Sequence, residues 1–455
     1  MRLPLYSFAA CLVAQAITMP TAAFANDAST PSVEISATTP VPSLKESVAN
    51  YLKHQNQHGQ FSGNVLIADN NTILFEQSLG LADVQSNRAI NNGNLFKVGS
   101  ITKQFTAAAI LRLAEQGKLS LTTTVDRYFP NLAKGDKITV LNLLDHTAGL
   151  QRDTAWRDSP KQCRSQAMIR TITKTSHTYP PALRYNFSHA NYLLLGSIIE
   201  QVSGIDYNTF IDQEFLRPLD MKDSSMKLTL SFQLAKSYEI SGLINAHITP
   251  TECAWAAGGL ITTSHDLLQW NRALHSGNVV SQSSLETMYR HQLGMIKSDY
   301  NGAPLYSMEG NIDGFKALLT YQPQQERSII ALSNYQNTNL SLLTTDLLRL
   351  TNGESAINKV SAPKSDTVTW QVNKDLVGNY QDNLGVPLQI VYEEGALTAK
   401  VNQANIPLVV KNSHSLYAEG IDNKIRVNRH ANNTTREIVF FSRDGRYLSR
   451  FVRVE

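Results

Sequence analysis

Ser100 and Lys103 lie three positions apart in the stretch "VGSITKQFTAAAI", where the pattern of the chain becomes helical. In a helix this spacing places the hydroxyl and the amine on one face. The positive end of the helix dipole and burial among apolar residues both favour the uncharged form of such a lysine. An uncharged amine beside a hydroxyl is a general base beside a nucleophile. The pair therefore predicts a serine activated for attack on a carbonyl, with its own backbone N–H available to stabilise an oxyanion.

The Ser-x-x-Lys spacing is not specific by itself, because it recurs from Ser224 and from Ser361. Only Ser100 opens a long helix, expected over 100–117, whose apolar residues cover most of its faces. A helix that is apolar nearly all round is buried in a protein's interior. This environment disfavours the alternative that Ser100 is only a helix cap and Lys103 a surface charge.

The surrounding segments predict the scaffold of the first 350 residues. A capping-box pattern starts a helix at Ser43 that ends by Gly59, and two strands flank the turn at 69–71. Further helices are expected in "ITVLNLLDHTAGL", ending near Gly149, and in "ANYLLLGSIIEQVSG", ending at Gly204; two more strands are expected in "FKALLTYQPQQERSIIALSN". Strands at both ends with helices between them predict one sheet built from the two ends of the domain, with a helical insertion.

The rest of the chain has a different pattern. Residues 351–369 are polar and weakly periodic, as expected for a linker. From 370 to 455 short alternating runs are separated by turn residues every 8 to 12 positions. This pattern predicts a second, all-β domain, either a small barrel or a sandwich.

The N-terminus predicts export. Arg2 and an apolar run precede the small-residue site Ala23-Phe24-Ala25, which is typical of a signal peptide over 1–25, and a Ser/Thr/Pro-rich lead-in is expected to be disordered over 26–42. The apolar run is too short and too interrupted for a stable membrane anchor. The expected location is therefore periplasmic or secreted. In such an oxidising compartment we expect Cys163 and Cys253 to form a disulfide.

Composition excludes several classes of partner. The 455 residues hold 41 Lys and Arg against 38 Asp and Glu, without the basic runs of a nucleic-acid binder. His54 and His58 are four apart, but no third ligand lies near them in sequence, so a solvated helix end is favoured over a metal site. We predict no metal, no cofactor and no nucleic acid; a small-molecule or peptide substrate is expected.

Five blocks resemble the serine β-lactamase-related hydrolases, which include class C β-lactamases, D,D-carboxypeptidases, D-aminopeptidases and esterases. The blocks occur in order over about 44–350: "LFKVGSITKQFTAAAILRLAEQGKLSLTTTVDRYFPNL", "ITVLNLLDHTAGL", "PPALRYNFSHANYLLLGSIIEQVSG", "AAGGLITTSHDLLQW" and "GNIDGFKALLTYQP". The resemblance implies an α+β fold over 43–350: an antiparallel sheet with flanking helices, a helical subdomain and a cleft between them. The segment from about 370 resembles the β-barrel domain of some members.

The resemblance also implies three motifs, of which only the first, Ser100 to Lys103, is intact. The second is usually Tyr-x-Asn and reads Phe187-Ser188-His189 in this chain. The third is usually Lys or His, then Ser or Thr, then Gly, and reads Met308-Glu309-Gly310. Phe187 has no hydroxyl to transfer a proton, and Met308 offers no charge to a substrate carboxylate.

Roles for the site residues follow from these motifs. Ser100 is expected to be the nucleophile and Lys103 its base, with an oxyanion hole from the N–H groups of Ser100 and Asn311. His189 is a candidate proton shuttle, the alternative being a structural histidine, and Tyr185 is a second candidate. The cleft is expected to present Phe187, Met308, Glu309 and Gly310 to the substrate.

A Ser-His-Asp arrangement using His146 and Asp145 is disfavoured, because the resemblance implies that "HTAGL" is a structural turn. The sequence thus predicts an exported serine hydrolase that forms an acyl-enzyme with small amides, esters or D-amino-acid peptides. Loss of the third-motif cation argues against substrates held by a terminal carboxylate. Two alternatives stay open: an acyltransferase using the same site, and an inactive homologue that serves as a binding protein.

Overall fold

The computed structural model describes most of the chain from Ser43 onward. The described residues are 43–151, 163, 165–174, 178–227, 232–240, 244–246, 250–357, 375–382, 385–393, 396–401, 404–412, 414–418, 421–430, 432, 434–441 and 447–454. The predicted signal peptide, the lead-in and most of the predicted linker lie outside these residues, and so does Ser361.

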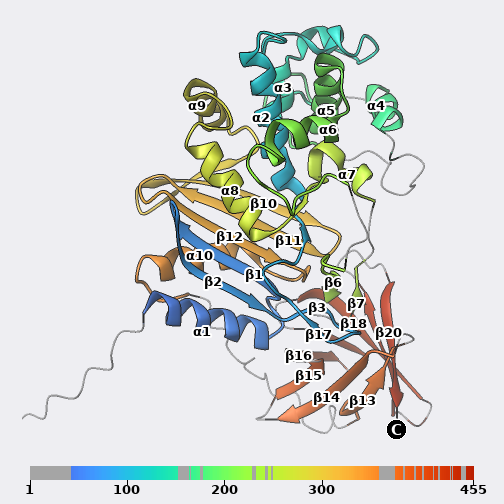
Figure 1. The fold of residues 1–455 in the computed structure, drawn as a ribbon. Helices are drawn as coiled ribbons and strands as arrows, with labels where there is room; N and C mark the ends of the chain where they lie inside the picture. The colour runs from blue at the N-terminus through green and yellow to red at the C-terminus, as the bar shows by residue number, and fades with distance from the viewer. Residues whose placement is uncertain are drawn as a thin grey trace, which may run out of the picture. The chain divides into compact units, whose positions relative to one another are not determined.

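A six-stranded antiparallel sheet forms the centre of the first domain (Figure 1). In spatial order its strands are β2 (Thr72–Leu79), β1 (Gly63–Asp69), β12 (Arg327–Ser333), β11 (Phe315–Gln322), β10 (Ala303–Ile312) and β9 (Ile296–Tyr300). Strand β1 therefore pairs with β12, more than 250 residues later in the chain, with Asp69 opposite Arg327. The guanidinium of Arg327 donates two hydrogen bonds, of 2.6 and 2.8 Å, to the carboxylate of Asp69. The prediction of one sheet from both ends of the domain is confirmed.

Helices cover both faces of this sheet. α1 (Leu44–Gln57) and α10 (Leu340–Thr351) share one apolar cluster with the sheet, which includes Leu305 and Leu318. α2 (Thr102–Glu115) and α8 (Ser264–His275) contribute to the larger cluster on the other face. α1 begins with the expected capping box, in which Ser43 and Glu46 exchange hydrogen bonds.

The helical subdomain extends the second of these clusters. Its elements are α3 (Val140–Leu144), α4 (Ser165–Thr173), α5 (His189–Ser203), α6 (Tyr207–Ile211), a π-helical turn (Asp212–Leu216), α7 (Thr251–Gly258) and α9 (Gln282–His291). As predicted, α5 ends at Gly204. The φ of this residue is 80°, a value that only glycine adopts readily. α3 ends well before Gly149, which corrects the sequence-based expectation: His146 has a left-handed φ of 60°. The predicted disulfide between Cys163 and Cys253 is present, with their Cα atoms 4.4 Å apart.

Short elements connect these layers. Two-stranded pairs join β3 (Leu81–Asp83) to β4 (Arg88–Ala89), β5 (Phe96–Lys97) to β8 (Ile261–Thr262), and β6 (Tyr238–Ile240) to β7 (Ile244–Asn245). The 3₁₀ turns are η1 (Gly99–Ile101), η2 (Val125–Arg127) and η3 (Gly135–Lys137). In the part of the chain that the structure describes, no helix has the length and apolar character needed to cross a membrane.

The C-terminal domain is a closed eight-stranded barrel, which decides between the two predicted architectures. Its strands are β13 (Gly378–Gln381), β14 (Pro387–Glu393), β15 (Ala396–Val401), β16 (Ala404–Asn412), β17 (Ser415–Ala418), β18 (Ile421–Arg429), β19 (Thr435–Phe441) and β20 (Tyr447–Val454). Alternate residues such as Leu388 and Ile390 are buried with Phe440 and Phe451 in its interior. Pairing of β13 with β20 closes the barrel over the residues that the structure describes.

Candidate active site

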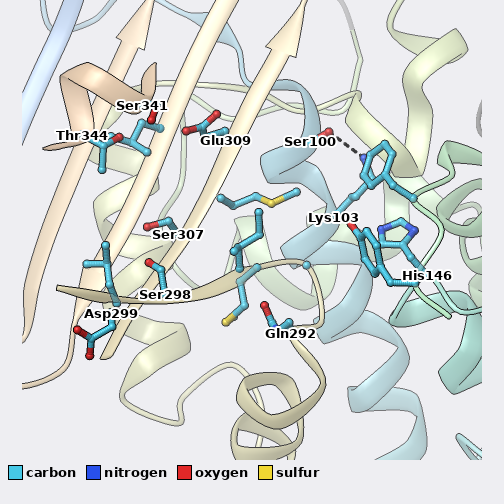
Figure 2. Close-up of a pocket in the computed structure, with 18 of the residues that line it drawn as sticks. Ser100, Lys103, His146, Gln292, Ser298, Asp299, Ser307, Glu309, Ser341 and Thr344 are labelled. Atoms are coloured by element: carbon cyan, nitrogen blue, oxygen red, sulfur yellow. Dashed lines mark hydrogen bonds between the residues drawn. The ribbon is translucent and has the colours of Figure 1, made fainter. Parts of the chain in front are cut away.

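Ser100 lies in η1, immediately before α2, so it sits in a 3₁₀ turn instead of the first α-helical turn. It is half-buried, whereas Lys103 is fully buried. The Nζ atom of Lys103 lies 2.9 Å from Oγ of Ser100 and donates a 2.6 Å hydrogen bond to the backbone oxygen of Ala257 (Figure 2). The predicted spacing on one face therefore brings amine and hydroxyl into hydrogen-bonding contact.

The acceptor for Lys103 comes from a distorted segment of α7. Trp255 has a left-handed φ of 33°, which is strained for a bulky residue. After this kink, the carbonyl of Ala256 accepts a 2.7 Å hydrogen bond from Thr106, one turn beyond Lys103. Close packing holds the kink in place: a Cβ atom on Gly196 of α5 would lie 2.6 Å from that of Ala256. Three helices thus fix the position of Lys103.

The third motif brings strand β10 against the turn that carries Ser100. A Cβ atom on Gly310 would lie only 1.9 Å from the backbone oxygen of Val98. A Cβ atom on Gly99 would lie 3.0 Å from the backbone nitrogen of Asn311. The two glycines let the strand and the turn approach each other, which places the backbone of Asn311 beside that of Ser100.

One aromatic ring from the second motif and one from α5 lie near the amine of Lys103. Nζ of Lys103 lies 5.4 Å from the ring centroid of Phe187 and 5.6 Å from that of Tyr192. Ser188 caps α5 by accepting a hydrogen bond from the N–H of Ala190, and His189 is the first residue of that helix. The rings of Phe187 and His189 meet edge to face, with centroids 5.0 Å apart.

Sequence reasoning set aside His146, yet it lies beside Lys103. Its Nδ1 accepts hydrogen bonds from Nδ2 of Asn191 (2.9 Å) and from the backbone N–H of Ser188 (3.4 Å). Burial is the main cause that lowers the pKa of His146 to about 3. The imidazole is therefore neutral, carries its proton on Nε2 and can only donate a hydrogen bond at that atom. The sequence signal that could have pointed to His146 was the "HTAGL" turn, in which this histidine adopts a left-handed backbone conformation.

The same geometry excludes the Ser-His-Asp arrangement. Nδ1 of His146 faces Asn191 and Ser188, where a triad needs a carboxylate. The carboxylate of Asp145 instead accepts hydrogen bonds from the backbone N–H and the hydroxyl of Thr147. Burial raises the pKa of Asp145, and the hydrogen bonds from Thr147 oppose this rise.

Most of the expected site residues line one cavity of about 950 Å³. Six of the predicted site residues line it: Ser100, Lys103, Tyr185, Phe187, Met308 and Glu309. Tyr185 is 64% exposed. His189, Gly310 and Asn311 are not among the described residues that line it. Burial raises the pKa of Glu309, with the charge of Lys316 acting in the opposite direction. A serine, a buried amine and adjacent backbone N–H groups are the parts needed for acyl transfer.

The family model for Beta-lactamase matches residues 48–351. The chain belongs to the Beta-lactamase family. The match covers the sheet and both helical layers, including Ser100, Lys103 and the third-motif strand. The family is one of serine hydrolases related to penicillin-binding proteins.

Among its family relatives, the chain is 28% identical over 300 residues to a putative penicillin-binding protein, PbpX, of Bacillus subtilis. That alignment covers 64% of this chain and 74% of PbpX. It is 27% identical over 313 residues to protein flp of Staphylococcus aureus, covering 64% of this chain but only 63% of flp. The chain therefore spans less than two thirds of the length of flp.

Solved structures share the fold at lower identity. An octameric penicillin-binding protein homologue from Pyrococcus abyssi superposes with a TM-score of 0.60 and 19% identity, over 89% of this chain and 99% of that one. A D-amino acid amidase from Ochrobactrum anthropi SV3, complexed with L-phenylalanine, superposes with a TM-score of 0.59 and 20% identity, over 67% of this chain and 99% of that one. At these identities the likeness shows the Beta-lactamase-family fold alone.

Proposed function

We propose that the protein is an exported serine hydrolase that forms an acyl-enzyme at Ser100 with small amides, esters or D-amino-acid peptides. The observation that carries the proposal is the 2.9 Å contact between Oγ of Ser100 and Nζ of the fully buried Lys103. Burial favours an uncharged amine. Once uncharged, Lys103 can still donate an N–H to the oxygen of Ala257 and can accept the hydrogen of the Ser100 hydroxyl at its lone pair.

In the acylation step, Oγ of Ser100 attacks the substrate carbonyl carbon while its proton passes to Nζ of Lys103. The backbone N–H groups of Ser100 and Asn311 hold the resulting oxyanion. The close approaches at Gly99 and Gly310 support this role, because they bring the two backbone segments together. The tetrahedral intermediate then collapses and breaks the bond to the leaving group, which takes a proton from a nearby donor, and the proton on Lys103 restores that donor. In the second half of the reaction, water attacks the acyl-enzyme and gives one proton to Lys103. The ester bond to Ser100 then breaks, Oγ of Ser100 takes that proton back, and the acid is released.

Tyr185 is our preferred donor for the leaving group, in place of the hydroxyl that Phe187 lacks. It lines the cavity with Ser100 and Lys103, whereas His189 is not among the described residues that do so. His146, which only the structure suggests, lines the same cavity and can offer the leaving group a hydrogen bond from its Nε2–H. We keep His189 as a weaker candidate for proton transfer.

The composition of the cavity informs the substrate class. Met308 provides an apolar thioether at the position where family members place a cation, so a substrate carboxylate gains no ion pair there. Amides and esters without that carboxylate are therefore favoured. The names of two similar proteins, which mention penicillin binding and a D-amino acid amidase, support an acyl-transfer site.

Intact-mass spectrometry after exposure to a fluorophosphonate tests the proposal. The purified chain should gain one adduct, and the Ser100→Ala variant should gain none. Hydrolysis of p-nitrophenyl acetate should be lost in the same variant, while added amine acceptors reveal any acyl transfer. Absence of the adduct in the unaltered chain would contradict the hydrolase proposal and favour a binding protein, an alternative supported by the two altered motifs.

A further inference from the structure

The cavity that contains Ser100 continues past the edge of the sheet. Strand β9 pairs with β10 only as far as Ile296 opposite Ser307, so β9 does not cover the edge of β10 beyond that point. The cavity is lined on one side by Ser100 and Lys103 and on the other by residues of α10 such as Thr344. The part of the cavity beside Ser100 and the part beside α10 therefore meet at the residues of β10 that follow Ser307.

Alternation along β10 shows that these two parts lie on opposite faces of the sheet. Met308 packs in the cluster shared with α2, whereas Leu305 packs in the cluster shared with α1 and α10. Glu309, which follows Met308 and is in step with Leu305, therefore points to the α10 face. We use "distal lobe" for the part of the cavity lined by Ser298, Ser307, Glu309, Ser341, Thr344, Thr345 and Leu348. Figure 2 shows Glu309, Ser307, Ser298, Ser341 and Thr344 at one end of the view and Ser100, Lys103 and His146 at the other.

Two threonine hydroxyls and one carboxylate can accept hydrogen bonds from a ligand in the distal lobe. The hydroxyl of Thr344 donates its hydrogen to the backbone oxygen of Leu340 (2.7 Å), and that of Thr345 donates to Ser341 (2.9 Å). Each hydroxyl oxygen is then left with lone pairs only. The carboxylate of Glu309 is also an acceptor when ionised. These groups suit a ligand that presents hydrogen-bond donors.

The charge of the distal lobe also favours a ligand with hydrogen-bond donors and a positive charge. Glu309 is the charged side chain of the distal lobe, and no Lys or Arg lines it among the described residues. Lys316 lies diagonally across the strand pair from Glu309, yet no salt bridge joins the two in the part of the chain that the structure describes. A primary ammonium group has three donors, no acceptor and a positive charge.

We propose that the distal lobe binds a primary-amine-bearing portion of the substrate, with Glu309 as its counter-charge, while the reacting carbonyl lies at Ser100. The proposal rests on the hydrolase function proposed above and names its substrate class: esters or amides that carry an amine on a flexible arm. The arm crosses the edge of β10 beyond Ser307. A carboxylate thus recognises the substrate in a motif where relatives are expected to offer a cation.

Matched esters test this proposal. We would measure kcat/KM for the p-nitrophenyl esters of 6-aminohexanoic, 6-hydroxyhexanoic and hexanoic acids, and for the corresponding eight-carbon series. The unaltered chain should prefer the amine over the methyl-terminated ester by about tenfold at one of the two lengths, mainly through KM, as a ~1.4 kcal/mol interaction gives. The Glu309→Gln variant should reduce this ratio to near one. Glu326→Gln, which removes an exposed carboxylate from the β11–β12 turn, serves as the control and should leave the ratio unchanged.

Equal rates for the amine and methyl esters at both lengths, a preference for the hydroxyl ester, or a preference that survives Glu309→Gln would each overturn the proposal. Failure of the hydrolase function is distinguishable, because then no ester is turned over and no fluorophosphonate adduct forms. In that case titration calorimetry of the Ser100→Ala chain decides the matter. Binding of 1,6-diaminohexane over 1,6-hexanediol, lost when Glu309→Gln is added, would support the amine site; equal or absent binding of the two would overturn it.

Discussion

The side-chain amide of Asn191 donates a 2.9 Å hydrogen bond to Nδ1 of His146. Together with the backbone N–H of Ser188, this contact makes Nδ1 an acceptor and leaves the proton on Nε2. His146 lines the active-site cavity, and its Nε2–H is a hydrogen-bond donor. His146 is thus suited to orient a substrate or leaving group but not to act as a general base.

Nitrogen-15 NMR of His146 checks this tautomer. Because burial lowers the pKa of His146 to about 3, the imidazole should stay neutral, with its proton on Nε2, from pH 5 to 8. The Asn191→Leu variant removes one donor and should broaden or shift the Nδ1 resonance. Titration of His146 within that pH range in the unaltered chain would contradict the assignment.

Removal of the proposed base should slow acylation. The Lys103→Met variant keeps much of the side chain's apolar volume and removes the amine that lies 2.9 Å from Ser100. General-base catalysis contributes about 10²–10⁴-fold. We therefore expect the rate of fluorophosphonate labelling to fall by about that factor. Lys227→Met, at the second Ser-x-x-Lys spacing, should label like the unaltered chain; labelling of Lys103→Met within about threefold of it would count against Lys103 as base.

Exchange of hydroxyls in the second motif tests the proton donor. Tyr185→Phe should lower kcat for an ester with a poor leaving group by about 10² or more. Adding Phe187→Tyr to that variant should restore part of the loss, because the ring of Phe187 already lies 5.4 Å from Nζ of Lys103. Activated p-nitrophenyl esters should be less affected, since their leaving group needs no proton. Equal effects on both kinds of ester would argue against a donor role for Tyr185.

Local signals in the sequence predicted much of the scaffold. The capping box at Ser43 and the glycine at 204 each act within one helix turn, and both helix ends were confirmed. The contact between Ser100 and Lys103 is equally local, since it follows from a spacing of three. Alternation also predicted the strands of the C-terminal domain, although closure into a barrel depends on β13 meeting β20.

Features of the site that depend on distant contacts were not predictable. The partners of His146 come from a helix that begins 43 residues later, and no local pattern shows that its ring faces Lys103. The extension of the cavity depends on where β9 stops pairing with β10, which hydropathy does not mark. His189 illustrates the converse: its place in a motif suggested a role, but the start of α5 does not bring it into the lining of the cavity.

Gly310→Ala should uncouple the oxyanion hole from the nucleophile. The added Cβ atom would lie 1.9 Å from the backbone oxygen of Val98, so β10 and the η1 turn must separate. Overpacking of this kind costs about 1–3 kcal/mol of stability. We expect a lower midpoint in thermal unfolding and a loss of fluorophosphonate labelling at temperatures where the variant is still folded. Gly93→Ala, whose Cβ atom would make only an ordinary 3.4 Å contact, is the control; full labelling of Gly310→Ala would show that the close approach is not needed.

Acid should destabilise the fold partly through His275, which is half-buried and stacked on Tyr321 with ring centroids 3.8 Å apart. Burial lowers the pKa of His275 to about 3, against about 6.5 in an unfolded chain. Between these values the unfolded state binds more protons, so the free energy of unfolding falls as pH decreases through that window and is constant above it.

Urea unfolding followed by the fluorescence of the buried Trp270 measures this effect. From pH 7.5 to 5, one such imidazole accounts for about 2 kcal/mol of lost stability. In the unaltered chain, the hydroxyl of Tyr289 lies 2.6 Å from Nδ1 of His275. The His275→Gln variant keeps a polar partner for this hydroxyl, but its side chain does not bind a proton in this pH range. It should therefore lose about 2 kcal/mol less than the unaltered chain over the same pH change. Substitution of the exposed His430 by Gln is the control, and an equal loss in all three proteins would show that His275 is not the group that titrates.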